Sequence, residues 1–188
     1  MIHLFKKKKN FLKLKFTRGF TLIETFVAIS IIMVAIVGPL LIVSRALSSS
    51  YYARDQIIAF YLAQDAVEFI RNKRDENKLN YINDSNKWLD GLEVCKNVNG
   101  CHIDTQKETF HQGVSPVLKF NKVSGIYGYD DTGDTSFIDT FFKRTIKIKT
   151  FSSGDEAIIS VDISWRTGIL DRSFNIKENI FNWQWQGQ

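Results

Sequence analysis

The fold of this chain is decided at Lys15-Phe16-Thr17-Arg18-Gly19-Phe20-Thr21-Leu22-Ile23-Glu24, where a basic leader gives way to a long apolar segment. The twenty residues between Glu24 and Arg45 carry no charge. As a helix rising about 1.5 Å per residue, they would extend about 30 Å, the thickness of the hydrocarbon core of a bilayer. The sequence therefore predicts a transmembrane helix that begins near Phe20. Glu24 is an ionisable residue in the first turns of this helix, which makes it a candidate functional residue.

The leader, residues 1–19, contains seven bases and no acid. Lys and Arg before an apolar span keep that end of a chain in the cytoplasm, so we expect the residues after Arg45 to lie outside. The leader also explains the overall charge of +5, because the rest of the chain has 18 bases and 20 acids. A slightly negative mature chain gives no indication of bulk binding to nucleic acid.

A conventional secretory signal peptide is the first alternative. Such a peptide has a shorter apolar core followed by a cleavage site of small residues. The stretch that follows here, Arg45-Ala46-Leu47-Ser48-Ser49-Ser50, contains only a weak site of that kind. An uncleaved signal anchor is the second alternative, but it gives no reason for Glu24 or for Gly19-Phe20.

Residues 19–24, Gly-Phe-Thr-Leu-Ile-Glu, resemble the class III signal of type IV pilins and of the related type II secretion pseudopilins. The resemblance implies that a prepilin peptidase cuts between Gly19 and Phe20 and that the new amino group of Phe20 is N-methylated. It also implies that Glu24 pairs with the N-terminal amine of a neighbouring subunit during assembly. Pairing is favoured physically because an unpaired carboxylate in lipid is costly; the alternative is an acid at the headgroup boundary.

Gly38 and Pro39 interrupt the apolar segment. Proline removes one backbone hydrogen bond and crowds the preceding turn of a helix, so we expect a kink or local melting. The resemblance to pilins implies a segment that can unfold and stretch in a filament. A proline that a membrane helix simply tolerates is the other interpretation.

Helical periodicity continues to about Lys73, where cations suit the negative end of the helix dipole. Apolar residues at spacings near three, four and seven predict one stripe, formed by Leu47, Tyr51, Ile58, Leu62, Ala66 and Phe69. Asp55 is expected off this stripe. We therefore expect residues 20–45 to form the transmembrane or filament-core part of the helix and residues 46–74 its amphipathic part.

Residues 75–188 are expected to form an extracytoplasmic loop region and sheet, with 75–115 mainly as loop. Alternation with period two predicts strands at 141–150, 156–166, 172–180 and, more weakly, 117–120. The turn Ser152-Ser153-Gly154-Asp155 should join the first two as an antiparallel hairpin, and Trp183 and Trp185 should pack at the end of the sheet. The predicted fold class is α+β, a long N-terminal helix packed on a C-terminal antiparallel sheet.

Cys95 and Cys101 are the two cysteines of the chain. In an outward-facing domain they allow one intramolecular pairing, and Asn99-Gly100 between them favours a turn, so we expect a disulfide. A metal site would need further ligands, for which only His102 and His111 are near.

Asp130, Asp131 and Asp134 surround a glycine and form a weak candidate for calcium. They lack the spacing of an EF-hand loop, and an acidic surface turn is the preferred interpretation.

A basic stripe runs along one predicted strand and consists of Lys143, Arg144, Lys147 and Lys149, of which the three lysines share the polar face. Such a stripe could contact DNA phosphates. Lysines that protect an exposed strand from aggregation are the preferred interpretation.

No nucleophile elbow, P-loop, HExxH or CxxC pattern is present, so neither an enzyme nor a cofactor is expected. Leu62-Ala63-Gln64-Asp65-Ala66-Val67-Glu68 and Val161-Asp162-Ile163-Ser164-Trp165 further resemble PilV-type minor pilins and GspI-type minor pseudopilins. The family resemblance implies a structural subunit of a pilus or secretion pseudopilus, used for adhesion, motility, DNA uptake or protein secretion. Its implied partners are prepilin peptidase, other pilin subunits, a membrane platform protein, an assembly ATPase and membrane lipid. The alternatives are a membrane-anchored extracytoplasmic binding module that does not polymerise and, less favoured, an anchored enzyme.

Overall fold

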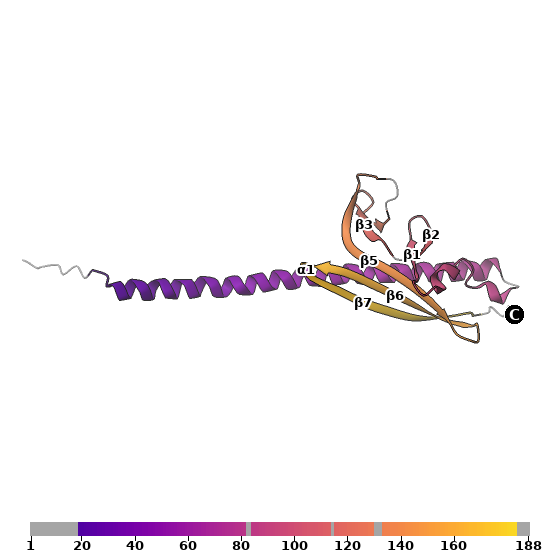
Figure 1. Cartoon of the computed structure of the whole chain (residues 1–188), viewed down its shortest axis with the longest axis horizontal. Coiled ribbons are helices and arrows are strands. Elements are labelled where there is room, and N and C mark those ends of the chain that lie inside the picture. The colour runs from indigo at the N-terminus through magenta and orange to yellow at the C-terminus, as the bar shows by residue number, and fades with distance from the viewer. Residues whose placement is uncertain (1–18, 82–83, 114, 130–132, 184–188) are drawn as a thin grey trace, which may run out of the picture. The chain divides into compact units, whose positions relative to one another are not determined.

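The computed structural model describes residues 19–81, 84–113, 115–129 and 133–183. Within them, one long helix, α1 (Leu22–Asn80), precedes two short 3-10 helices and an antiparallel sheet (Figure 1). The α+β class predicted from the sequence is confirmed. The chain divides into two compact units, Met1–Leu47 and Ser48–Gln188.

The helix α1 begins directly after Thr21, which caps it. The hydroxyl oxygen of Thr21 accepts a hydrogen bond from the N–H of Glu24 at 3.3 Å. The carbonyl of Thr21 accepts from the N–H groups of Glu24 and Thr25 at 3.0 and 3.2 Å. Thr21-Leu22-Ile23-Glu24 is a capping-box sequence, and a negative charge in the first turn is favoured by the helix dipole. The helix therefore begins two residues later than predicted.

Gly38 and Pro39 lie inside an uninterrupted helix. The local melting expected at this dipeptide is absent from α1. Proline removes the hydrogen bond to the carbonyl of Ala35, but apolar residues on both sides continue the helix, and single prolines are tolerated in apolar helices.

The helix ends at Asn80 rather than near Lys73. Its last turns are held by Asn77, which is buried and donates from its side-chain amide to the carbonyls of Trp88 and Asp90, at 3.3 and 2.8 Å. Sequence periodicity could not predict this extension because it depends on a contact with the following loop.

The predicted stripe of α1 is confirmed in its second part, where Leu62 and Ala66 are buried and Ile58 and Phe69 pack against the core, but not at its start. Leu47 and Tyr51 are more than half exposed. Small residues recur on the face of α1 that packs on the sheet, and they allow the helix to approach the sheet closely. The predicted stripe consisted mainly of large side chains. The buried residues of α1 are Asp55, Ala59, Leu62, Ala63, Ala66, Val67, Ile70 and Asn77.

The sheet is centred on one long strand, β5 (Phe137–Thr150). One edge of β5 pairs with β6 (Glu156–Thr167), which pairs in turn with β7 (Leu170–Phe181). The other edge pairs with β3 (Val117–Asn121), which carries β4 (Tyr127–Gly128), and with β1 (Cys101–Asp104), which carries β2 (Thr109–Gln112). The predicted hairpin of 141–150 with 156–166 is confirmed, with a register from Lys143↔Ser164 to Thr150↔Ala157.

The alternation predicted for β6 is confirmed in the core. Its inward residues are buried in one cluster with the buried face of α1, namely Ala157, Ile159, Val161, Ile163 and Trp165. The sheet therefore covers the second half of α1 with one face and leaves a polar face outside.

The region 75–115 is more ordered than the expected loop. It contains the end of α1, the 3-10 helices η1 (Ser85–Lys87) and η2 (Glu93–Lys96), and the β1–β2 hairpin. Strands of four residues with polar members give little periodicity, which explains the omission.

The tryptophans are arranged differently from the prediction. Trp88 is buried, and its indole N–H donates to the carbonyl of Gly154 at 3.0 Å. Trp183 is 45% exposed because β7 ends before it, at Phe181. Trp185 lies outside the described residues.

Candidate functional site

The predicted cleavage point lies in non-helical backbone ahead of α1. Gly19 and Phe20 are both exposed and precede the first helical residue, Leu22. The phenyl ring of Phe20 is 77% exposed. Exposed, non-helical backbone is the form in which peptidases reach a peptide bond. The remaining leader, residues 1–18, lies outside the described residues.

Glu24 is exposed and is the only acid among residues 19–54. It lies in the first turn of α1, in a capping-box position, so one local role is to stabilise the start of the helix. Because its charge is isolated within an apolar surface, it also attracts an ammonium or guanidinium group from outside this helix.

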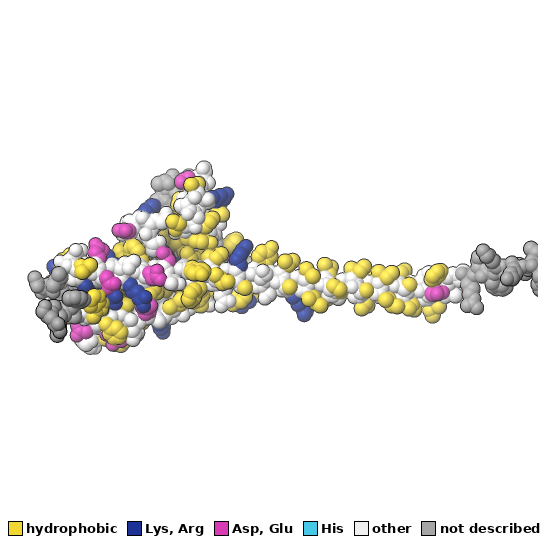
Figure 2. Space-filling view, turned by 180° about the vertical axis from the view of Figure 1, so that it is seen from behind, with side chains coloured by type: hydrophobic (Ala, Val, Ile, Leu, Met, Phe, Trp, Pro, Cys, Tyr) yellow, Lys and Arg dark blue, Asp and Glu magenta, His cyan; other side chains and the backbone are white. Residues whose placement is uncertain are grey.

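The helix surface after Glu24 is largely apolar on the face that Figure 2 shows. Large apolar side chains from Phe26 to Val43 are 50 to 75% exposed. This segment has a mean hydropathy of 2.9 and is long and apolar enough to cross a membrane. An apolar surface of this extent is stable only when lipid or other protein covers it.

Two hydroxyl groups of this segment bond to the helix itself. Thr25 donates from its hydroxyl to the carbonyl of Leu22 at 2.8 Å, and Ser30 donates to the carbonyl of Phe26 at 2.9 Å. These hydroxyls can therefore enter hydrocarbon without losing a partner.

The predicted disulfide between Cys95 and Cys101 is present, and both cysteines are fully buried. Gly100 closes the loop with a φ of +72°, and its N–H donates to the carbonyl of Asn97 at 2.9 Å. A Cβ at Gly100 would lie 2.5 Å from the carbonyl oxygen of Ile146. The loop thus needs glycine for both its conformation and its packing.

The alternative of a metal site at the cysteines is wrong because both sulfurs are used in the disulfide. His102 and His111 lie opposite each other on β1 and β2, with ring centroids 5.1 Å apart. In the described part of the chain, no group of three His, Cys, Asp or Glu residues could hold a metal ion.

The acidic cluster is described only at Asp134, since Asp130 and Asp131 lie outside the described residues. The carboxylate of Asp134 accepts hydrogen bonds from the N–H and the hydroxyl of Ser136, at 2.9 and 2.7 Å. These contacts are those of a side chain that stabilises a turn.

Only three of the four residues of the predicted basic stripe are exposed. Lys143, Lys147 and Lys149 are exposed on the outer face of β5, whereas Arg144 is buried on the inner face. The alternation of side chains along the strand predicts this difference, because Arg144 has the same parity as the inward Ile146 and Ile148.

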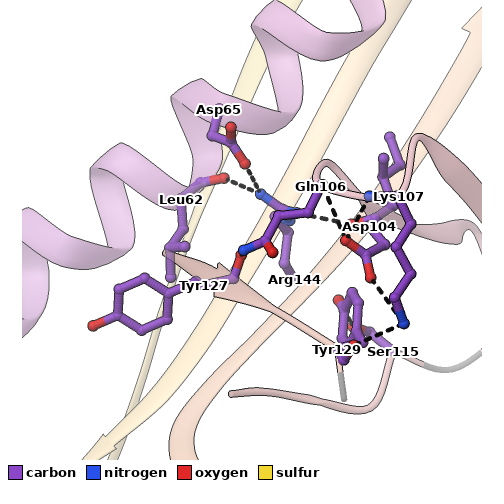
Figure 3. A network of polar contacts seen from close by, with 10 residues as sticks. Leu62, Asp65, Asp104, Gln106, Lys107, Ser115, Tyr127, Tyr129 and Arg144 are labelled. Carbon is purple, nitrogen blue, oxygen red and sulfur yellow. Dashed lines mark hydrogen bonds and ion pairs between the residues drawn. The ribbon is translucent and has the colours of Figure 1, made fainter. Parts of the chain in front are cut away.

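Arg144 joins β5 to α1 and β1 (Figure 3). One guanidinium nitrogen donates to the carbonyl of Leu62 at 2.9 Å and to the carboxylate of Asp65 at 2.7 Å. The other donates to the carbonyl of Ile103 at 2.8 Å. A buried guanidinium is stable only with such acceptors, so Arg144 fixes the position of the helix on the sheet.

A second part of this polar network stabilises the β1–β2 turn (Figure 3). The buried carboxylate of Asp104 accepts from the N–H groups of Gln106 and Lys107, at 3.0 and 3.3 Å. The hydroxyls of Ser115 and Tyr129 are 3.2 Å apart, and burial raises the pKa of Tyr129. The sequence gives no signal for this network because its members are spread from residue 62 to residue 144.

Asp55 is a second buried acid that the sequence analysis placed on the wrong face. Its carboxylate accepts from the guanidinium of Arg54 at 2.9 Å and from the hydroxyl of Thr167 at 3.1 Å. Asp55 thereby ties α1 to the end of β6, a contact between residues 112 positions apart.

An apolar groove lies between the exposed side of α1 and strand β7. It is lined by Gln56, Ile57, Phe60, Tyr61, Phe174 and Ile176. Exposed aromatic and branched side chains in a groove favour contact with another apolar surface.

No protein-family model, no curated protein and no solved structure matches this chain.

Proposed function

We propose that this chain is a type IV pilin-like structural subunit, a minor pilin or a pseudopilin. The observation that carries the proposal is Gly19-Phe20-Thr21-Leu22-Ile23-Glu24 at the start of a helix whose following twenty residues carry no charge. In this proposal, prepilin peptidase cuts after Gly19 on the cytoplasmic side, and the amine of Phe20 is methylated.

The chemistry of assembly follows from the charges at the cut. Cleavage creates one ammonium group at Phe20 and leaves one carboxylate at Glu24, so each subunit carries one charge of each sign at this end. If the carboxylate of one subunit pairs with the ammonium of the next, the two charges neutralise each other, and neither remains as an isolated charge in lipid. Such a head-to-tail contact is heterologous and repeats without closing, which gives a filament rather than a dimer.

The exposed apolar helix supports the same proposal. Lipid covers residues 25–44 before assembly, and the helices of other subunits cover them afterwards. The domain after Arg45 then lies outside the cytoplasm, where the Cys95–Cys101 disulfide is expected to form and persist. A platform protein and an assembly ATPase in the membrane are the partners that would drive extraction from lipid.

The test is the N-terminal mass of the chain recovered from membranes of a host that contains prepilin peptidase. The expected species begins with N-methylated Phe20. A matched variant, Gly19→Leu, should remain uncut because a bulky residue replaces the small one at the cleavage point. A wild-type chain that still begins with Met1, in cells whose peptidase cuts a control pilin, would favour the membrane-anchored binding module instead.

A further inference from the structure

Strand β7 forms one edge of the sheet (Figure 1). Among the residues that the structure describes, it pairs with β6 alone. This pairing runs without a bulge from Thr167↔Leu170 to Glu156↔Phe181, and β7 contains no proline. In an antiparallel ladder, every second residue directs its N–H and C=O away from its partner strand. The free edge of β7 therefore offers a row of backbone donors and acceptors to which another strand can pair.

The apolar groove between α1 and β7 runs along this edge. On the side of α1 it is lined by Ile57, Phe60 and Tyr61, whose side chains are 53 to 64% exposed. On the side of β7 it is lined by Phe174 and Ile176, which also pack against the core. A strand added to β7 would place every second side chain over this groove and cover its apolar surface.

The sequence of β7 is complementary to itself when two copies run antiparallel with Asn175 opposite Asn175. In that register, Phe174 of one copy faces Ile176 of the other, and Arg172 faces Glu178. Directly opposite side chains have their Cβ atoms about 5 Å apart, so apolar meets apolar and each charge meets its opposite, twice over. Moving the register by one pair in either direction would set Arg172 against Ile176 or Glu178 against Phe174.

The two charged residues decide which strand the edge accepts. Both lie on the face of β7 toward α1, where the guanidinium of Arg172 is 5.1 Å from the ring centroid of Tyr52 and Glu178 forms an ion pair with Arg71. Charges on the inward face of an edge strand normally prevent pairing, because an incoming apolar strand would bury them. A second copy brings the opposite charge to each position, whereas an unrelated strand does not.

We propose that the free edge of β7 pairs with the same edge of a second copy, antiparallel and centred on Asn175. The contact is isologous, so it closes after two copies and differs from the head-to-tail contact proposed for Glu24. It involves residues of the unit Ser48–Gln188 alone and requires neither cleavage nor filament assembly, so either proposal can fail without the other. Each hydrogen bond gained replaces one to water, so the pair forms where copies are concentrated, and dilute copies stay monomeric.

The register is tested with single added thiols on the full chain in detergent, at high protein concentration and with micelles in excess. Both native cysteines are joined in the disulfide, so the added cysteine is the reactive thiol. Asn175→Cys should give disulfide-linked dimers on mild oxidation. The matched control is Ser173→Cys, because residue 173 is also exposed on β7 but lies about 13 Å along the strand from its own copy in the pair.

We expect Asn175→Cys to cross-link at least tenfold faster than Ser173→Cys. Equal rates at the two positions would overturn the proposal, because random collisions link both positions alike. Slow cross-linking at both positions would also overturn it and would leave the edge to a strand of another protein.

The charges are tested by exchanging them between copies, in the Asn175→Cys background. Arg172→Glu sets two carboxylates opposite each other, and Glu178→Arg sets two guanidinium groups opposite each other, so each variant alone should cross-link at least tenfold more slowly. In an equal mixture of the two variants, every position again faces the opposite charge, and mixed dimers should form at the original rate.

The mixture separates contacts between copies from contacts within one copy. Each variant loses the same contact with Tyr52 or Arg71 whether it is alone or mixed, so recovery in the mixture can come only from pairing between copies. Mass measurement of the linked species identifies the mixed dimer. A mixture that cross-links no faster than its separate components would overturn the proposed register.

Discussion

Arg144 shows how much of the stability of the unit Ser48–Gln188 depends on a single side chain. It is buried, while its partner Asp65 is about half exposed. Arg144→Met should therefore lower the free energy of unfolding by about 3 kcal/mol, because two carbonyls lose their charged donor and α1 loses its link to β5. Asp65→Asn should cost about 1 kcal/mol or less, since the exposed partner is replaced by another acceptor.

Urea unfolding of the full chain in detergent micelles, followed by tryptophan fluorescence, measures both Arg144→Met and Asp65→Asn. Equal losses for the two variants would contradict the interpretation of Arg144 as the buried member that needs its partners.

Tyr129 makes the stability depend on pH. Burial raises the pKa of its hydroxyl, so the folded state holds this proton above the ordinary tyrosine pKa of about 10. The contribution of Tyr129 is therefore complete below pH about 10 and is lost as the pH rises through the folded-state value. Tyr129→Phe should reduce the fall of the Tm as the pH rises above about 10. A slope of the Tm against pH that is the same in wild type and Tyr129→Phe would refute the role of Tyr129.

At the scale of elements, the disulfide loop and the β3–β4 turn offer a matched pair of glycines. Gly100 and Gly125 both have a φ of +72°, but a Cβ at Gly125 would meet no atom within 4 Å. Gly125→Ala should cost about 1 kcal/mol for the left-handed backbone alone. Gly100→Ala should cost more than twice as much, because its Cβ collides with the carbonyl of Ile146, which cannot move without disturbing β5.

Thermal unfolding, with alkylation and mass measurement of free thiols, checks both the stability of Gly100→Ala and its disulfide. The loop contributes about 2 kcal/mol through the Cys95–Cys101 bond. If Gly100→Ala and Gly125→Ala are equally stable, the predicted collision has been relieved by movement of the loop.

The long strands β5, β6 and β7 were predictable because each obeys a local period. In β6, five inward residues alternate with outward residues that are polar except for Ile158. The buried face of α1 was not predictable in the same way, because it is chosen by what packs on it. Asp55 contacts a residue 112 positions away, and local pattern alone would place its charge outside. The alternation of β5 gives the inward position of Arg144, but not its partner Leu62, which is 82 positions away.

The candidate assembly motif could be read from the sequence because it consists of neighbouring residues. The contact of Thr167 with Asp55 could not, because these two residues are 112 positions apart in the sequence.

At the scale of the whole molecule, Glu24 provides the prediction that separates anchoring from assembly. Glu24→Gln keeps the helix start and the apolar segment, so membrane insertion and cleavage after Gly19 should be unchanged. Loss of the charge removes the partner of the Phe20 ammonium, and at about 1.4 kcal/mol per tenfold change we expect filament yield to fall at least tenfold.

The filament yield of Glu24→Gln is measured as the subunit content of sheared surface fractions relative to membranes. Glu93 is an exposed acid of the unit Ser48–Gln188, so Glu93→Gln is the matched control and should assemble normally. Normal filament yield for Glu24→Gln would remove the assembly role of Glu24 and leave only its part in the capping box.

The hydroxyls of Thr25 and Ser30, which bond to carbonyls of their own helix, affect how the chain behaves in the membrane before assembly. In a bilayer, helices gain no hydrophobic energy from meeting, and polar side chains are a principal source of attraction between them. These two hydroxyls already donate to the carbonyls of Leu22 and Phe26. Two copies of this segment that meet in the membrane therefore gain little from hydrogen bonds between these hydroxyls. The chain would then diffuse in the membrane as a monomer before assembly, and subunits would enter the filament one at a time.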